Sequence, residues 1–352
     1  MTYKMFDHQM SGPLLFTKII HPATTISVSH IKTLSKINSS SNEVHKKGLI
    51  LLQKEVDLNY KPHVITDVDI GPQGQGIGHA EFVGDAMQLL NLTIMFLCTK
   101  QTQYAKKAIS IQDQWNIKCK TFKGSNAPLE CAWGSICMLR SMEILKYTYD
   151  GFRSYEGFQE RFSSFLNLII LPNLTNRYKE ITKWNNNWIL TIQEALLQYY
   201  LYMDDINNAN KILNDFRAVL PKCIIHDCGI CTETTRDLIH SQFQLGSIVQ
   251  IAEVCWNQGL DIYSVNKNTI YKCLEYHARI LNGNIPVEMN KNDLKDVWFM
   301  PSIWDIAYNH YKNRMKCLDG MPQTDKLLRT KCNRPEKLTF NWGPAWVHYS
   351  SH

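Results

Sequence analysis

The sequence of 352 residues lacks several features that would assign it to a common class at once. It has no run of 18 or more apolar residues, so no membrane-spanning helix and no membrane partner are expected. The N-terminal residues lack a continuous apolar stretch and a small-residue cleavage site, so no signal peptide is evident. The net charge is only +6 and no nucleic-acid-binding module is recognisable, so a nucleic-acid partner is not expected either.

The cysteines do not form a disulfide framework or a clear metal motif. There are 11, an odd number scattered along a long chain, whereas small disulfide-rich domains carry dense and even sets. The segment Cys223–Cys231 has a spacing that zinc could use, with His226 and Cys228 between its ends, but it lacks two paired CxxC elements. We predict a surface hairpin there, with or without a disulfide, rather than a metal site.

The glycine-rich segment 71–78, GPQGQGIG, does not fit a nucleotide-binding loop. A P-loop needs a following Lys-Ser/Thr pair, and a dinucleotide fingerprint needs a preceding strand and a later acidic residue. Residues 61–79 are therefore predicted to be a long irregular loop with a functional role.

Beyond residue 80 the apolar residues recur at helical spacing, and neither alternating strands nor a strict repeat is visible. The chain divides into a lead-in over residues 1–60, a helical body over 61–330 and an irregular tail over 331–352. Short breaks between helices predict antiparallel hairpins arranged as a bundle, a solenoid or a closed α/α toroid, hence an all-α fold. The predicted helices are 81–98, 101–118, 128–148, 156–171, 176–182, 186–203, 205–219, 235–258, 266–281, 301–314 and 324–330.

The segment from Cys231 to Tyr263 combines a dense polar turn with an apolar helix. Arg236 and His240 are four residues apart, so on the predicted helix they share a face with Asp237 between them. Arginine suits bidentate carboxylate binding, and histidine can act as a base near neutral pH. From spacing alone, a surface ion pair with a capping histidine has equal weight.

Two other segments group polar and aromatic residues. Three asparagines, residues 185–187, lie between Trp184 and Trp188, and a helix cap would account for only one of them. Further along, Tyr308 and Tyr311 flank an Asn-His pair on the last long helix. A buried tyrosine with a lowered pKa could act as acid or base, although aromatic packing in the core is an equal alternative for Tyr311.

These residues resemble the alginate lyase-like polysaccharide lyases. The similarity lies in ETTRDLIHSQFQLG followed by AEVCWNQGLDIY, in His21-Pro22, in GSNAPLECAWGSICMLRSMEIL, in Asn187-Trp188 and in IWDIAYNHYKNR. Met321-Pro322 and Arg334-Pro335-Glu336 resemble C-terminal landmarks of that family. The matches are individually weak, but their order and spacing extend over most of the chain.

The resemblance implies an incomplete or closed α/α toroid, residues 61–330, that cleaves a uronic-acid polysaccharide by β-elimination. Asn187, Arg236 and His240 would neutralise the uronate carboxylate, and Tyr308, with Tyr311 as substitute, would move the proton. No metal or other cofactor is needed, the partner is an acidic polysaccharide, and family members are normally exported. The remaining substrate contacts would be Trp188, Glu233, Asp237, Gln242, Gln258, His310 and Tyr311.

The sequence also departs from the family pattern. Thr235 replaces a glycine, Leu238 and Ile239 replace a Gln-Gly pair, and Met300 replaces an arginine that would contact the substrate. These changes leave two alternatives open. One is an inactive relative that still binds carbohydrate, and the other is a toroid glycoside hydrolase using Glu233 and Asp237 as acid and base.

Overall fold

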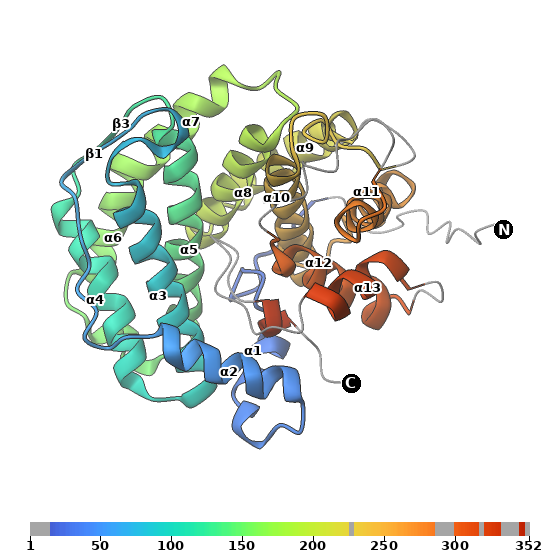
Figure 1. The fold of residues 1–352 in the computed structure, drawn as a ribbon. Helices are drawn as coiled ribbons and strands as arrows, with labels where there is room; N and C mark the ends of the chain where they lie inside the picture. The colour runs from blue at the N-terminus through green and yellow to red at the C-terminus, as the bar shows by residue number, and fades with distance from the viewer. Residues whose placement is uncertain (1–14, 225–228, 286–298, 317–319, 332–344, 349–352) are drawn as a thin grey trace.

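The chain folds into helical hairpins arranged in an arc (Figure 1). The structure is a computed structural model that describes residues 15–224, 229–285, 299–316, 320–331 and 345–348. Its α-helices are α1 (Val28–Leu34), α2 (Glu43–Glu55), α3 (His79–Thr99), α4 (Thr102–Lys118), α5 (Ala127–Thr148), α6 (Phe158–Phe165), α7 (Leu171–Glu180), α8 (Asn187–Tyr202), α9 (Ile206–Cys223), α10 (Leu238–Asn257), α11 (Val265–Leu281), α12 (Pro301–Tyr308) and α13 (Pro322–Lys331).

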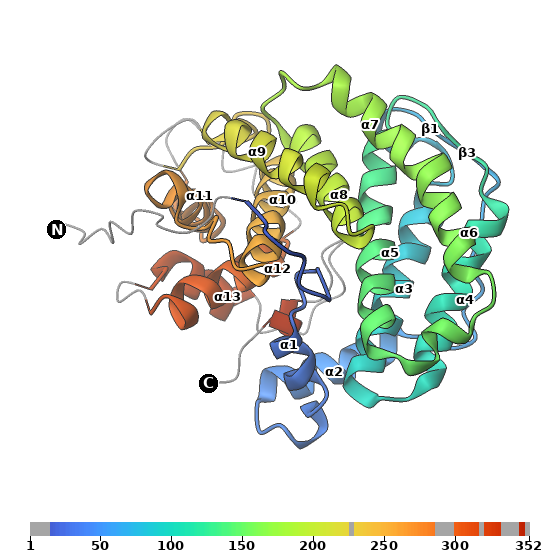
Figure 2. The same cartoon turned by 180° about the vertical axis from the view of Figure 1, so that it is seen from behind.

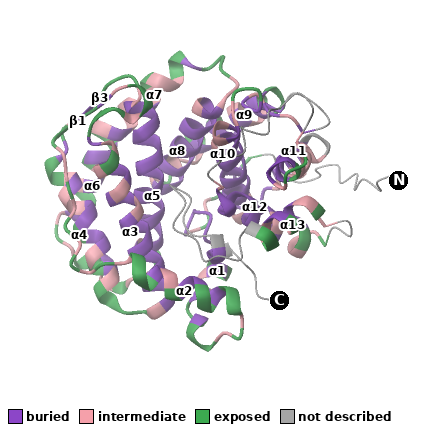
Figure 3. Cartoon of the chain, viewed as in Figure 1, coloured by how far each residue is buried: buried purple, intermediate pink, exposed green. Residues whose placement is uncertain are grey.

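The helices form an inner and an outer layer. The helices α3, α5, α8 and α10 are buried around most of their circumference, and each packs against the next (Figure 3). The outer helix α9 instead buries a single face, made by apolar residues at three- and four-residue spacing, which is the pattern of a helix with one solvated side. The all-α prediction is confirmed, and the arrangement is an α/α toroid.

The toroid is incomplete. The hairpin α3–α4 and the helices α12–α13 lie at opposite ends of the arc in both views (Figures 1 and 2). The short helices α1 and α2 pack against α3, and the 3-10 turn Ala345–His348 packs against α1, α2 and α12. These N- and C-terminal elements therefore bridge the ends of the arc. Of the predicted C-terminal tail only Lys331 and residues 345–348 are described, and Arg334–Glu336 lies outside the described residues.

One inner helix has the length and apolar composition of a membrane span. That helix is α3, with a mean hydropathy of 1.4, and 78% of the relevant window is buried inside the fold. Because the neighbouring helices α4 and α5 cover it, its apolar character is explained by its place in the core.

Prolines do not end the helices where the sequence pattern predicted. A break was predicted at Leu171–Asn173, but a π-helical turn, Leu166–Ile170, leads directly into α7. Pro172 lies in the first turn of α7 and has no N–H to donate to the π-helical turn before it, yet the helix continues through this position. Similarly, α9 continues past Pro221. The single helix predicted over 301–314 is divided in the structure into α12 and a π-helical turn, Asn309–Arg314.

The loop predicted over residues 61–79 contains strands. The strands β1 (Asp67–Ile70) and β2 (Gly76–Ile77) are antiparallel, and β3 (Thr121–Lys123) lies parallel to β1 on its other side. This prediction was wrong because β3 is distant in sequence and the strands are very short. Two glycines are required here: a Cβ atom at Gly76 would lie 2.2 Å from the Asp69 carbonyl oxygen, and one at Gly124 would lie 2.2 Å from that of Ile70.

The segment before α1 packs against the C-terminal ends of the inner helices. Gln258 exchanges two hydrogen bonds with the backbone of Ile20, and Asn257 donates to the carbonyl oxygens of Thr24 and Thr25. These bonds tie the backbone of the N-terminal segment to two side chains at the C-terminal end of α10. Gln258, predicted to bind substrate, therefore anchors the N-terminal segment.

His21 links this segment to α5. Its Nδ1 lies 2.5 Å from the buried Glu143 carboxylate and its Nε2 lies 2.8 Å from Asp204, while its ring stacks on Tyr147. The hydrogen bond with Glu143 raises the pKa of His21 despite partial burial, and Asp204 adds to the effect. Lys146 lies 4.0 Å from Asp204 and is the nearby opposing charge.

A raised histidine pKa predicts a pH-dependent contribution to stability. The stabilisation is fully present below the unfolded-state pKa of about 6.5 and is lost as pH rises through the higher folded-state pKa. We expect His21→Gln to lower Tm more at pH 6 than at pH 9, as measured by thermal unfolding of both proteins across that range. An equal Tm difference at both pH values would contradict the protonated pairing of His21 with Glu143 and Asp204.

Candidate active site

The N-terminal ends of the inner helices meet at one end of the toroid. The strands β1 and β3, which precede α3 and α5, pair with each other. Arg177 at the end of α7 donates to the carbonyl oxygen of Ser125 before α5, and the backbone N–H of Asn187 at the start of α8 donates to Glu233 before α10. The polar residues that begin these helices are thereby collected on one rim.

The first group on this rim joins Asn187, Glu233 and Arg236. The Glu233 carboxylate is buried, accepts the Asn187 N–H at 3.2 Å and lies 3.7 Å from the Arg236 guanidinium. Asn187 is also buried, and its Oδ1 has no hydrogen-bond partner among the described residues. Arg236 is half exposed, so its guanidinium can reach a ligand from solvent.

The second group is a histidine held by an aspartate. Asp237 is the N-cap of α10, and its Oδ1 accepts the backbone N–H of His240 at 2.6 Å. Its other oxygen lies 2.7 Å from Nδ1 of His240. The carboxylate thereby favours the tautomer with hydrogen on Nδ1, which leaves Nε2 as a proton acceptor. Within the described ranges no hydrogen bond occupies that Nε2.

The predicted helix over 235–258 begins too early. Because α10 starts at Leu238, Arg236 lies in the preceding turn and does not share a helical face with His240. Asp237 brings them together instead, since its Oδ2 is 3.9 Å from Nε of Arg236 as well as close to the imidazole. The N-cap preference of aspartate was the available signal for this start.

Hydrogen bonds to buried side chains position the loop before α10. Gln244 accepts from the backbone N–H of Glu233 and donates to the hydroxyl of Thr232, which in turn donates to the Asn185 carbonyl oxygen. Asn186 is the N-cap of α8 and accepts from the N–H of Trp188, as one of the three asparagines was predicted to do. The loop and the start of α8 are therefore held as one unit.

A buried thiol and imidazole lie beneath the same loop. Nε2 of His277 is 3.6 Å from Sγ of Cys231 and 2.9 Å from the hydroxyl of Thr234. Burial opposes the charged form, but hydrogen bonds from Cys273 and the His277 charge hold the pKa of Cys231 well below its usual range. The thiolate in turn raises the pKa of His277. This pair connects the loop to α11.

The hairpin predicted at Cys223–Cys231 is present as an isolated bridge between Ile224 and Cys231. Cys223 and Cys231 are both free and buried, so they do not form a disulfide with each other. His226 and Cys228 lie outside the described residues. Across the residues the structure describes, no group of three or more His, Cys, Asp or Glu side chains is placed to hold a metal ion.

Two tryptophans lie beside Asn187. Trp184 is 42% exposed and contacts Trp188 edge to face, with ring centroids 6.1 Å apart. The guanidinium of Arg177 lies 5.5 Å from the centre of the Trp188 ring. An aromatic and cationic surface therefore continues from Asn187 toward α7.

A histidine–glutamate pair on the rim was missed from the sequence. Nδ1 of His79, the first residue of α3, lies 2.9 Å from the buried carboxylate of Glu130 on α5, which also accepts from Asn126. One turn further along α5, Trp133 contacts Phe243 of α10, which touches His240. The one available signal was that His79 directly follows the glycine-rich loop.

The two tyrosines predicted to move the proton do not join this cluster. The hydroxyl of Tyr308 donates to Asp325 on α13 at 2.5 Å, with Lys312 over its ring. Tyr311 is buried and donates to the backbone of Tyr263. Both hydroxyls thus bond to neighbouring elements of the fold.

Gln242 and His310, which were also predicted to contact the substrate, make contacts within the fold. Gln242 accepts from the N–H of Met300 and so fixes the start of α12. His310 is buried, stacks on Tyr263 at 3.9 Å and meets Trp256 edge to face. Trp256 is sixteen residues beyond His240 on α10, which at about 1.5 Å per residue is roughly 24 Å along the axis.

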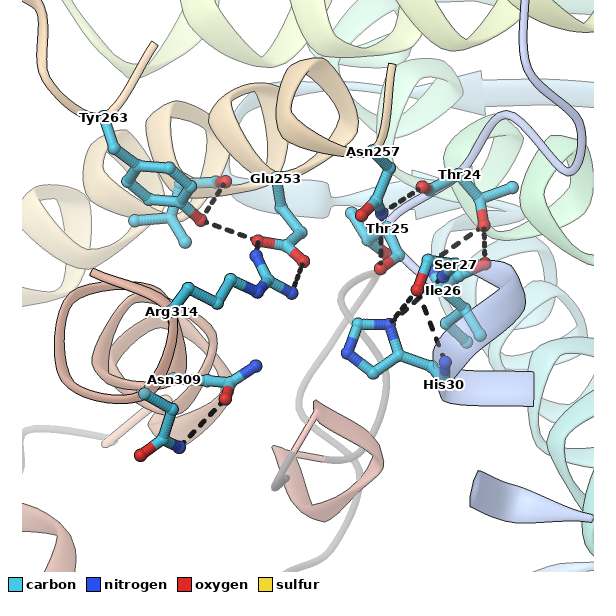
Figure 4. Close-up of polar contacts among 12 residues, drawn as sticks. Thr24, Thr25, Ile26, Ser27, His30, Glu253, Asn257, Tyr263, Asn309 and Arg314 are labelled. Atoms are coloured by element: carbon cyan, nitrogen blue, oxygen red, sulfur yellow. Dashed lines mark hydrogen bonds and ion pairs between the residues drawn. The ribbon is translucent and has the colours of Figure 1, made fainter. Parts of the chain in front are cut away.

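A second polar cluster occupies this opposite end of α10 (Figure 4). The Glu253 carboxylate forms two bonds with Arg314, at 2.7 and 2.9 Å, and accepts from Tyr263. His30 and Ser27 lie to the right of Glu253 and Arg314 in this view and bond to each other. Burial lowers the pKa of His310 to about 3, so this histidine is neutral at ordinary pH.

Comparison with protein families gives one match to this chain. The alginate lyase family matches residues 59–286, which is more than half of the sequence and includes Asn187, Arg236 and His240. The match ends before α12, so Tyr308 lies beyond it. A comparison with curated proteins finds no match.

The solved structures to which this chain is similar include alginate lyases. One from Bacteroides ovatus has a TM-score of 0.66 at 14% identity, covering 90% of this chain and 98% of that one. Alginate lyase A1-III from Sphingomonas species A1 has a TM-score of 0.66 at 14% identity, covering 95% and 98%. A histidine-to-alanine variant of A1-III complexed with a tetrasaccharide is equally similar, covering 97% and 99%. At this identity the likeness shows the fold.

Proposed function

The chain belongs to the alginate lyase family, and from this membership we propose that it is a polysaccharide lyase that cleaves a uronic-acid polymer of the alginate or glucuronan type by β-elimination. The proposed reacting centre is the rim at the N-terminal ends of α8 and α10, with Asn187, Arg236 and His240 in contact with the substrate. The proposed substrate is an external polymer, so export of the protein is part of the proposal.

The observation that carries this proposal is the arrangement of His240 and Arg236 around Asp237. Nδ1 of His240 is 2.7 Å from the aspartate, and the half-exposed guanidinium is 3.9 Å from the same carboxylate oxygen. A proton acceptor and a carboxylate-binding cation are therefore held side by side and open to solvent. β-Elimination next to a carboxylate requires this combination.

In the proposed mechanism, Arg236 and the side chain of Asn187 bind the carboxylate at C6 of the sugar. Nε2 of His240 removes the proton from C5, and charge develops on the carboxylate, where Arg236 stabilises it. The bond between C4 and O4 then breaks, its electron pair leaves with O4, and a C4–C5 double bond forms. The imidazolium returns its proton to O4. Asp237 stabilises the imidazolium between these steps.

This assignment revises the one that the family resemblance implied. Tyr308 was expected to move the proton, but its hydroxyl donates to Asp325 on α13. His240 has both the free nitrogen and the adjacent carboxylate-binding group, so the proposal gives it the role of the base.

A hydrolase is the less suitable alternative. An acid/base pair for hydrolysis must flank the bond, with carboxyl groups about 5–9.5 Å apart. Glu233 and Asp237 both lie within 4 Å of Arg236, and Glu233 is buried under Asn187. Glu233 is therefore engaged with Asn187 and Arg236, and Asp237 with Arg236 and His240, so the two carboxylates hold the arginine and the histidine.

The proposal predicts that the protein produces unsaturated uronates. We expect ultraviolet absorbance of the C4–C5 double bond to rise when the protein is incubated with one or more of polymannuronate, polyguluronate and glucuronan. The panel also identifies the polymer. Products with saturated ends would indicate hydrolysis instead.

A folded protein that gives no absorbance on any polyuronate would contradict the proposed activity. In that case, binding of the same polymers, measured by calorimetry, would identify an inactive carbohydrate-binding relative. Absence of both turnover and binding would remove the acidic polysaccharide as a partner.

A further inference from the structure

The rim beside the proposed reacting centre carries an aromatic pair that the catalytic steps do not use. Trp184 lies in the connection between α7 and α8, and Trp188 is in the first turn of α8, directly after Asn187. Their rings meet edge to face at 6.1 Å. The chain therefore places an aromatic surface immediately next to one of the groups proposed to hold the uronate carboxylate.

Core packing does not explain Trp184. Its side chain is 42% exposed, whereas Trp115, Trp133, Trp304 and Trp346 are all buried. Burying an indole contributes favourably to folding, and this surface remains in water in the unliganded protein. Exposed tryptophans beside a reacting centre commonly supply a flat face for a ligand, and pyranose rings present apolar C–H groups that suit such a face.

Arg177 adds charge to the same surface. Its guanidinium lies 5.5 Å from the Trp188 ring centre and 2.9 Å from Glu180, which is 62% exposed. An ion pair with such an exposed partner is weak, because water and salt screen it. A ligand carboxylate can therefore compete with Glu180 for this arginine, and the guanidinium geometry suits that exchange.

We propose that Trp184, Trp188 and Arg177 form a subsite that binds a uronate residue adjacent to the one that is cleaved. The sugar ring packs on the exposed indole of Trp184, and its carboxylate binds Arg177. This inference rests on the proposed function, because it assigns the neighbouring part of the same polymer. The subsite contributes to binding of the chain and takes no part in proton transfer.

The test measures binding apart from turnover. Uronate oligosaccharides from the cleaved polymer are titrated into the His240→Ala variant, with and without Trp184→Ala, and tryptophan fluorescence and calorimetry report Kd. We expect Trp184→Ala to weaken binding roughly tenfold, as loss of one good aromatic contact would. In the active protein the same substitution should raise KM and leave kcat nearly unchanged, while Trp184→Phe should retain most of the affinity.

Charge controls separate a specific site from general attraction. Arg177→Gln should weaken binding of uronate oligosaccharides more than Lys183→Gln, which removes one positive charge from the same exposed segment. Unchanged Kd and KM in Trp184→Ala would overturn the subsite even if the lyase activity is present. Equal losses from Arg177→Gln and Lys183→Gln would overturn the role of Arg177. Failure of the proposed function is recognised separately, by absence of turnover in the unmodified protein.

Discussion

Replacing His240 with alanine is expected to lower kcat on the cleaved polyuronate by at least about 100-fold, which is the lower end of what a positioned acid/base group contributes. The imidazole is the proposed proton acceptor, with Nδ1 held 2.7 Å from Asp237 and Nε2 left for the substrate. KM should change much less, because Arg236, Asn187 and the tryptophan surface remain. The measurement is the initial rate of ultraviolet absorbance over a range of polymer concentrations.

Two further variants distinguish this role from a structural one. Asp237→Asn keeps a side chain that can cap α10 but no longer stabilises an imidazolium, so kcat should fall while the melting temperature changes little. Tyr308→Phe removes the bond to Asp325 on α13 and should keep most of the activity. The opposite result, with loss of turnover in Tyr308→Phe and activity retained in His240→Ala, would return the proton transfer to the tyrosine.

Helical periodicity was enough to predict most of the toroid. The segments 186–203 and 205–219 were both predicted as helices, and they correspond to the buried α8 and the outer α9. The strands were missed because pairing of β1 with β3 depends on residues far apart in the sequence. The π-helical turns were missed because local propensity does not distinguish them from ordinary helix.

The candidate site was predicted only in part, for similar reasons. Arg236 and His240 were selected from residue type and spacing, and Asn187 was placed by the family resemblance. The structure brings their loops together through Glu233 and Asp237. Tyr308 was also selected, because it lies in a polar and aromatic motif. Its hydroxyl bonds to Asp325 on α13, and the sequence does not reveal this contact.

His79 is the converse example. It stands alone in the sequence, and only the packing of α3 on α5 places its ring beside Glu130.

The second large effect concerns the Glu253–Arg314 pair at the opposite end of α10. Replacing Arg314 with methionine is expected to reduce the free energy of unfolding by about 3–5 kcal/mol, the usual cost of leaving one partner of a buried ion pair alone. Glu253 is fully buried, and Arg314 supplies two of its hydrogen bonds, at 2.7 and 2.9 Å (Figure 4). Chemical denaturation of the variant beside the unmodified protein measures the loss.

The size of the effect depends on an unpaired charge, and this gives a matched control. Replacing Glu253 and Arg314 together with methionine removes both charges, and such apolar replacements of buried pairs are often neutral. The double variant should therefore be more stable than Arg314→Met alone, while Lys46→Met, which breaks an exposed pair with Glu43, should change little. The Glu253–Arg314 pair joins α10 to the turn after α12. A small loss of unfolding free energy in Arg314→Met would therefore mean that other contacts, such as that of Gln242 with Met300, suffice to hold α12 against α10.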